Sequence, residues 1–144
     1  LSSFPFAAAH SLLVFNNELY FQASDGTHGY ELWKYDGTNA NMIADINVGS
    51  GSGLYDSNGA YTQRGPIVFN DQLFFKANDG INGFELWRYD GINTLSMIAD
   101  INPGNTDPEP YLTELNNELY FTADDGIHGQ ELWKYSHQTS VTYF

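Results

Sequence analysis

Short runs of aromatic and aliphatic residues alternate with clusters of Asn, Asp and Gly along the whole chain. In the run ELYFQ at residues 18–22, Leu19 and Phe21 point to one side of an extended strand and Tyr20 points to the other. A strand that is apolar on both faces belongs to a sheet that is covered on both sides. No window of about 11 residues places its apolar positions at a helical period. We therefore expect an all-β protein with essentially no helix.

One segment of the chain occurs in three copies. Residues 16–35 and 116–135 differ at only four positions, and residues 70–89 carry the same pattern with conservative replacements. The motif Met-Ile-Ala-Asp-Ile-Asn follows the first two copies. Such internal repetition predicts one structural unit per copy. The predicted division is an N-terminal connector 1–11, repeat 1 at 12–47, a Gly/Ser-rich flexible connector 48–66, repeat 2 at 67–102, a connector 103–111 and repeat 3 at 112–144.

Each repeat predicts a meander of four antiparallel strands. The first strand is short and ends at an Asn-Asn or Asn-Asp pair, which tolerates the positive φ angles of a tight hairpin. A DGxxG loop separates the second and third strands, and an Asp-Gly turn precedes a fourth strand carrying Met-Ile-Ala-Asp-Ile. The strands predicted for repeat 1 lie at 12–15, 18–22, 30–35 and 42–46, and the first strands of the other repeats at 67–69 and 112–115.

The third repeat departs from this pattern at its end. Ser136-His137 replaces the Asp-Gly pair, which weakens the prediction of its last hairpin. The tail at 141–144 can supply a fourth strand, but it lacks the Met-Ile-Ala-Asp-Ile motif.

Repeats of this size with two-faced strands are typical of β-propeller blades. Closed propellers take roughly 4 to 8 blades, and this chain has three repeats. The blades would close by oligomerisation, as a six-bladed homodimer, or as part of a longer repeat array. The alternative is a β-trefoil, which also contains three four-stranded repeats.

Charge and composition exclude several partners. The 144 residues include 18 Asp and Glu against 5 Lys and Arg, a net charge of −13. A surface without clustered cations is unsuited to nucleic acid or to an anionic membrane. No apolar stretch approaches the ~18 residues that would indicate membrane insertion, and the absence of cysteine excludes disulfides and thiolate metal sites.

The strings ELWKYDGT at 31–38, ELWRYDGI at 85–92 and ELWKY at 131–135 resemble the ELWxxDGT repeat family. Members of that family occur as long arrays in secreted and cell-surface proteins, chiefly bacterial, and resemble propeller-forming units. The resemblance covers nearly all of residues 12–135. It implies an extracellular or cell-surface location and a repeat-built fold, and it implies no ligand.

The repeated aspartates are the candidate metal ligands. Clustered carboxylates on loops of an acidic protein suit calcium, the one cofactor that these residues indicate. The alternative is turn chemistry, in which the Asp side chain accepts hydrogen bonds from backbone amides two residues on. His28 and His128 lie in separate repeats, so they are not expected to share a metal. The candidate calcium ligands are Asp25, Asp79 and Asp125 in the DGxxG loops, and Asp36 and Asp90 in the Asp-Gly turns.

Aromatic residues are the candidate ligand contacts. The repeated Trp can stack on a sugar ring or can belong to the core between repeats. The residue before each Glu-Leu-Trp varies, so it can diversify a ligand contact or can be an unconstrained exposed position. The candidates are Trp33, Trp87 and Trp133 in the motif and Tyr30, Phe84 and Gln130 at the variable position.

The glutamate of each Glu-Leu-Trp motif has two structural alternatives and an unconvincing catalytic one. It can be a buried acceptor, or it can pair with the basic residue of the same repeat. Acid–base catalysis needs two carboxylates in different environments, whereas repetition makes the environments alike. The glutamates are Glu31, Glu85 and Glu131, and the basic residues are Lys34, Arg88 and Lys134.

These observations predict an extracellular, non-enzymatic binding or adhesion module with one weak site per repeat. Its expected partner is a glycan or a cell-surface protein, because weak repeated sites gain affinity by multivalency. The competing hypothesis is a purely structural repeat protein of a cell surface or larger complex, and an enzyme comes third.

Overall fold

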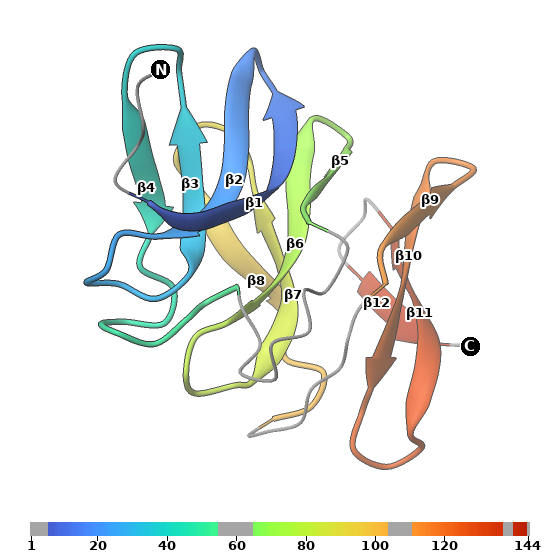
Figure 1. Ribbon diagram of the computed structural model, residues 1–144. Helices are drawn as coiled ribbons and strands as arrows, with labels where there is room; N and C mark the ends of the chain where they lie inside the picture. The colour runs from blue at the N-terminus through green and yellow to red at the C-terminus, as the bar shows by residue number, and fades with distance from the viewer. Residues whose placement is uncertain (1–5, 55–64, 104–110, 137–139, 144) are drawn as a thin grey trace. The chain divides into compact units, whose positions relative to one another are not determined.

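In the computed structural model, residues 6–54, 65–103, 111–136 and 140–143 can be described. These residues form three four-stranded antiparallel sheets, one per repeat, as Figure 1 shows. They contain no helix, and therefore none that could cross a bilayer. The predicted all-β class and the four strands of each repeat are confirmed.

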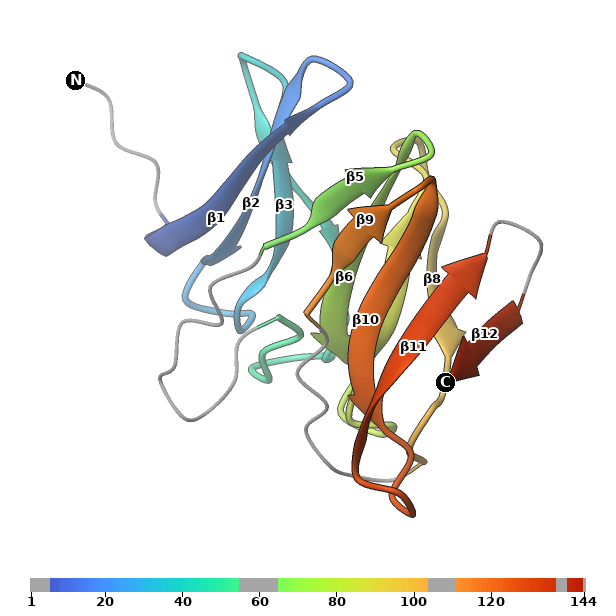
Figure 2. The ribbon, with the colours of Figure 1, turned by 90° about the vertical axis from the view of Figure 1, so that its right-hand side faces the viewer.

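In every sheet the strands pair in sequence order, with the second and third strands in the middle. Figure 2 shows this order plainly for the third sheet. The first sheet holds β1 (Ala7–Phe15), β2 (Glu18–Ser24), β3 (Glu31–Tyr35) and β4 (Ala40–Ala44). The second holds β5 (Ile67–Phe69), β6 (Gln72–Asn78), β7 (Phe84–Tyr89) and β8 (Leu95–Ala99). The third holds β9 (Thr113–Leu115), β10 (Glu118–Asp124), β11 (Gln130–Ser136) and β12 (Ser140–Tyr143).

The chain divides into two compact units. Unit 1 comprises Leu1–Gly65 with Asn78–Gly80 and contains the first sheet. Unit 2 comprises Pro66–Ala77 with Ile81–Phe144 and contains the second and third sheets.

Two-residue turns join the first two strands of each sheet, as the Asn-Asn and Asn-Asp pairs predict. Phe15 pairs with Glu18, and Leu115 pairs with Glu118 across the equivalent turn. All six turn residues have positive φ, which Asn and Asp tolerate better than other non-glycine residues. Their φ angles are 50° and 60° at Asn16 and Asn17, 47° and 55° at Asn70 and Asp71, and 53° and 61° at Asn116 and Asn117.

The Asp-Gly hairpins form, but their loops are wider than two residues. Tyr35 pairs with Ala40 and Tyr89 with Leu95. Asp36 Oδ1 accepts hydrogen bonds from the backbone N–H of residues 38 and 39, both at 2.7 Å. The Asp side chain therefore organises the loop from its first position.

Several strand boundaries differ from the prediction. β1 begins at Ala7, inside the predicted connector 1–11. Its pairing with β2 shifts register twice, between Ala7 and His10 and between His10 and Leu13. Its run of small residues hides the alternation that marks a strand. β4 spans Ala40–Ala44 rather than 42–46. It ends before Ile46 because the N–H of Ile46 donates to the Glu31 carboxylate instead of to a neighbouring strand.

The last strand of the third sheet is β12, which pairs Val141 with Tyr135. The tail thus supplies the predicted fourth strand without the Met-Ile-Ala-Asp-Ile motif. Residues 137–139, where His137 replaces the turn glycine, lie outside the described residues, as does 55–64 in the Gly/Ser-rich connector.

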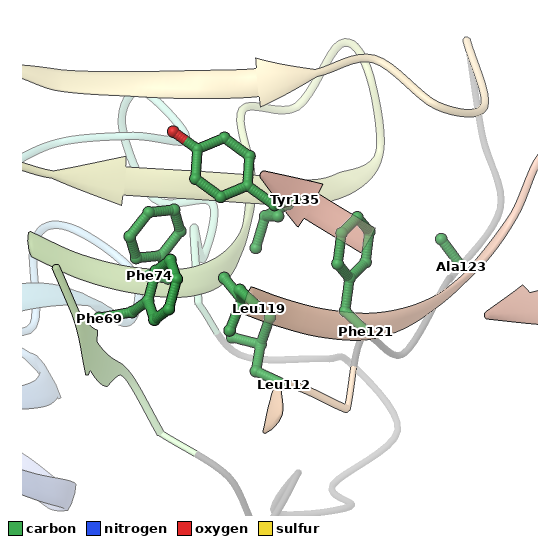
Figure 3. Close-up of a cluster of buried hydrophobic side chains, with 8 residues drawn as sticks. Phe69, Phe74, Leu112, Leu119, Phe121, Ala123 and Tyr135 are labelled. Atoms are coloured by element: carbon green, nitrogen blue, oxygen red, sulfur yellow. The ribbon is translucent and has the colours of Figure 1, made fainter. Parts of the chain in front are cut away.

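The core of unit 2 lies between its two sheets. Adjacent residues Leu73, Phe74 and Phe75 of β6 are 0%, 1% and 2% exposed, so both faces of the second sheet are buried. Figure 3 shows side chains of the two sheets meeting in one cluster. The cluster contains Phe69, Phe74 and Leu86 of the second repeat and Leu112, Leu119, Phe121, Ala123 and Tyr135 of the third.

Unit 1 has its own cluster of Phe21, Ala23 and Trp33. Phe6 packs on it, with its ring centroid 4.7 Å from that of Trp33 and 5.5 Å from that of Phe21. The residue that precedes β1 thereby joins the core of its own unit.

The turn geometry leads to a test at Asn117, whose φ is 61°. Asn117→Ala should lower the free energy of unfolding by about 1 kcal/mol, because alanine disfavours the left-handed region. Asn117→Gly should match or exceed the wild-type stability. Urea unfolding midpoints measure both effects, and Asn39→Ala, at an exposed loop position without positive φ, is the control. Equal losses in the Ala and Gly variants would show that the side chain of Asn117, not its φ, stabilises the turn.

Candidate functional site

The aspartates that open the DGxxG loops organise the backbone of those loops. Asp25 Oδ1 accepts the N–H groups of Thr27 and His28, both at 2.8 Å. Asp125 Oδ1 accepts those of Ile127 and His128, both at 2.9 Å. Turn chemistry, the alternative to calcium binding, is therefore confirmed as a role for both aspartates.

Each of these aspartates also holds a histidine. Asp25 Oδ2 lies 2.8 Å from Nδ1 of His28, and Asp125 Oδ2 lies 2.8 Å from Nδ1 of His128. The histidine side-chain hydrogen bond, with the backbone N–H bonds, lowers the pKa of Asp25 to about 2. The pKa of Asp125 is also about 2, where the largest cause is the hydrogen bond from the His128 backbone.

The same contacts raise the pKa of both histidines above 6.5, because the carboxylate stabilises the imidazolium. A raised histidine pKa contributes stability below pH 6.5, which is lost as pH rises through the folded-state pKa. The lowered pKa of Asp25 and Asp125 contributes stability above pH 3.8, lost as pH falls toward 2. Asn82 takes the place of the histidine in the second repeat.

Two of the predicted calcium ligands, Asp25 and Asp36, lie in different loops of the first repeat. The loops of Asp25 and Asp36 flank the five-residue strand β3, so they lie at opposite ends of a strand about 16 Å long. Asp36 and Asp90 also use Oδ1 to bind the amides of their own loops, which lowers their pKa, to about 2 for Asp90. Asp79 occupies the corresponding position of the second DGxxG loop. Asp25 and Asp36 therefore organise two separate loops at the two ends of β3, and calcium binding by the repeated aspartates stays a prediction.

The structure brings together a different group in the third repeat. One ligand atom each from Asp125, His128 and Glu131 lie within 4.8 Å of one another, and the described residues contain no second such group. A nitrogen with two carboxylates suits a divalent transition metal such as zinc. Sequence reasoning missed this group because it considered the histidines only as partners of each other. The spacing of three residues from Asp to His and from His to Glu was the available signal, but Asp25, His28 and Glu31 have the same spacing, so the sequence does not distinguish the third repeat from the first.

The glutamates of the Glu-Leu-Trp motif are buried acceptors in the first two repeats. Glu31 accepts the N–H of Ile46 at 3.1 Å and that of Gly53 at 2.8 Å, and burial raises the pKa of its carboxyl. Glu85 accepts the N–H groups of Ile101 at 3.1 Å and Asn102 at 3.3 Å. The segment after the fourth strand is thus tied to the middle of its own sheet.

Glu131 differs from its two counterparts. Both of its carboxylate oxygens are buried, and no hydrogen-bond donor reaches them from the described residues. The third repeat lacks the Met-Ile-Ala-Asp-Ile-Asn segment, which supplies one of the two amides that bind Glu31 and the two amides that bind Glu85. The glutamate that stabilises two repeats therefore has a desolvation cost in the third repeat that no hydrogen bond from the described residues offsets.

The alternative pairing of these glutamates with the basic residues of the motif is wrong for Lys34 and Lys134. Lys34 Nζ binds Glu18 at 3.1 Å, and Lys134 Nζ binds Glu118 at 2.8 Å. Both pairs join the second and third strands on the side of the sheet opposite Glu31 and Glu131, since neighbouring positions alternate.

The motif tryptophans have core environments. Trp33 is 8% exposed and donates from Nε1 to the carbonyl oxygen of Ala23 at 2.9 Å. Trp133 makes the same bond to Ala123 at 3.1 Å and packs against the core of unit 2. Trp87 is half-buried, with a buried Nε1. Stacking on a sugar is therefore not open to Trp33, and the core alternative holds for it.

The variable position before each motif is better placed for a ligand. The half-exposed Tyr30 stacks on His10, with centroids 5.4 Å apart and planes at 19°. The half-exposed ring of Phe84 lies 4.3 Å beneath Lys76 Nζ, and Gln130 is exposed. Equivalent positions therefore present three different chemical groups on the same scaffold.

A second set of exposed, variable residues lies at the tips of the DGxxG loops. Thr27, Ile81 and Ile127 occupy the third position of the three loops, and all are exposed. Ile127 is 81% exposed, although isoleucine is usually buried. Their signal in the sequence was variation inside an otherwise constant loop.

Comparison with known proteins adds no assignment to this geometry. No family model matches the chain, and neither a curated protein nor a solved structure matches it. The resemblance to ELWxxDGT repeats remains a prediction from the motif residues.

The Asp–His contacts predict local pKa changes. Asp25→Asn should lower the pKa of His28 toward 6.5 and leave that of His128 unchanged, because the two pairs lie in different repeats. Asp125→Asn should do the reverse. NMR titration of the imidazole protons measures each pKa, with His10, whose pKa is lowered by burial, as an internal control. A histidine that keeps its raised pKa without its aspartate would contradict this assignment.

The contrast between Glu31 and Glu131 predicts opposite effects of one substitution. Glu31→Ala should lower the free energy of unfolding by about 3 kcal/mol, because two buried amides lose their acceptor. Glu131→Ala should change it by less than about 0.5 kcal/mol or increase it, since a buried carboxylate without donors is removed. Urea unfolding of both variants compares them directly. A large loss in Glu131→Ala would show that its carboxylate has a stabilising partner.

Proposed function

We propose that this protein is an extracellular, non-enzymatic binding or adhesion module, with carbohydrate as its ligand class. The observation that supports this function is a constant scaffold with variable exposed positions. The turns, the Asp-organised loops and the core recur in each repeat, whereas Tyr30, Phe84 and Gln130 differ. Repetition of a rigid frame with changing surface groups suits weak, multivalent recognition.

The ligand contacts in this proposal centre on the variable position rather than on the motif tryptophans. Tyr30 and Phe84 offer aromatic surface at the start of the third strand, and Gln130 offers an amide. An aromatic ring beside a polar or cationic group, as in the contacts of His10 with Tyr30 and Lys76 with Phe84, suits a sugar with both apolar and hydroxyl surfaces. The proposed site does not require calcium, although calcium can contribute to it.

The sheets themselves are proposed to be blades of the β-propeller type. Burial of both faces of the second sheet supports this fold. Each sheet contains strands of one repeat only, which favours blades over a β-trefoil. Three blades would close by oligomerisation or within a longer array.

A purely structural role is the second candidate, and one observation favours it. The third sheet exposes large apolar residues on its strands, with Leu115 57% and Leu132 48% exposed. Such a surface suits assembly. An enzyme is the weakest candidate, because Asp25 and Asp125 have almost the same contacts and almost the same pKa.

A glycan array tests the binding proposal. Fluorescently labelled protein should bind a defined set of glycans, and Tyr30→Ala with Phe84→Ala should reduce the signal at least about tenfold through lost avidity. Ile92→Ala is the matched control, because Ile92 is exposed in the loop that follows β7, whereas Phe84 begins that strand. Parallel arrays with calcium and with EGTA separate a metal-dependent site from a metal-independent one. No binder above background, or full binding by the double variant, would reject the proposed site.

A further inference from the structure

One face of the third sheet carries apolar residues that remain exposed. Strand register places Leu115, Tyr120 and Leu132 on this face, together with the ion pair of Glu118 and Lys134. We call these five residues the outer face of the third sheet. The opposite face contains Leu119, Phe121 and Tyr135, which are buried against the second sheet.

The equivalent residues of the second sheet are buried. Phe69 corresponds to Leu115 and is 2% exposed, against 57% for Leu115. Leu86 corresponds to Leu132 and is 1% exposed, against 48% for Leu132. The same positions of the repeat thus form an interior in one sheet and a surface in the next.

The third sheet covers those residues of the second. Phe69, Phe74 and Leu86 pack on Leu119 and Tyr135 in one cluster, and the ring centroids of Phe74 and Tyr135 lie 5.2 Å apart. Arg88 Nη1 adds a polar contact by donating to the hydroxyl of Tyr135 at 3.4 Å. The second sheet's counterpart of the outer face is therefore complementary to the face of the third sheet that contains Leu119 and Tyr135, which we call the inner face.

In the described part of the chain, no sheet follows the third sheet to cover its outer face. The first sheet contains a face equivalent to the inner face of the third sheet. Leu19, Phe21 and Tyr35 are the counterparts of Leu119, Phe121 and Tyr135, in the same register. Leu19 and Tyr35 are half-exposed, whereas Leu119 and Tyr135 are buried. Phe6 packs on Phe21 in this face and covers part of it.

We propose that the outer face of the third sheet binds the first sheet of a second copy of this chain, in a head-to-tail contact. Lys134 of one copy takes the position of Arg88 and faces Tyr35 of the other copy. Two copies joined at both junctions contain six sheets, within the roughly 4 to 8 blades of a closed propeller. The proposal rests on the blade-type stacking proposed above and is independent of carbohydrate binding.

The oligomeric state tests the proposal. Light scattering after size exclusion should give the wild type twice the 16.1 kDa mass of the chain. Leu132→Asp should be a monomer, because the contact would bury the added carboxylate, and burying a charge that no opposite charge pairs costs free energy. Ile127→Asp should remain a dimer, since Ile127 is an equally apolar and more exposed residue of the same repeat that lies outside the face. A monomeric wild type, or a dimeric Leu132→Asp variant, would overturn the proposal.

Cross-linking tests the head-to-tail orientation without relying on a destabilising variant. The chain has no cysteine, so Lys134→Cys and Tyr35→Cys each introduce one thiol. A bis-maleimide should join the two variants to each other in a mixture and should join neither to itself. Self-linking of Lys134→Cys would indicate a symmetric contact between two outer faces, and no linking would indicate that the faces do not meet; either result rejects the orientation. Neither experiment contains a glycan, so failure here leaves the binding proposal to its own test.

Discussion

Apolar side chains on both faces of a sheet are the constraint on which this structure depends. A sheet that is apolar on one face can cover that face and leave the other in water, whereas a sheet like β5–β8 needs neighbours on both sides. The second and third sheets satisfy part of this requirement through their shared core. The requirement is not met at Leu115 and Leu132, which remain exposed on the other face of the third sheet.

Most of the repeated acidic side chains accept hydrogen bonds from the backbone of this chain. Asp25, Asp36, Asp90 and Asp125 each bind amides of their own loop, and Glu31 and Glu85 bind amides of the segment after the fourth strand. Copying the motif copies these carboxylates, so the net charge of −13 is partly a result of repetition. The group formed by Asp125, His128 and Glu131 is different, because only there does the carboxylate of the motif lack donors among the described residues.

Much of the fold was predictable because its signals are local. The positive φ of Asn16 and Asn17 follows from residue types that tolerate it, and the four strands per repeat follow from alternating runs between turn residues. The start of β1 at Ala7 was not predictable, because small residues and two register shifts conceal the alternation. The core environment of Trp33 was one of two alternatives, and its bond to Ala23 was not predictable, because burial depends on residues distant in sequence.

The sequence by itself determined the repeat, the all-β class, the tight turns and the side chains able to organise loops, because each depends on a few neighbouring residues. Only the tertiary structure decided which of these side chains act alike. Glu31 has two backbone donors and Glu131 has none from the described residues, although both lie in the same motif. Leu86 is buried and Leu132 exposed for a similar reason. The surroundings of a residue are supplied by the segment or sheet that packs on it, and similar repeats have different neighbours.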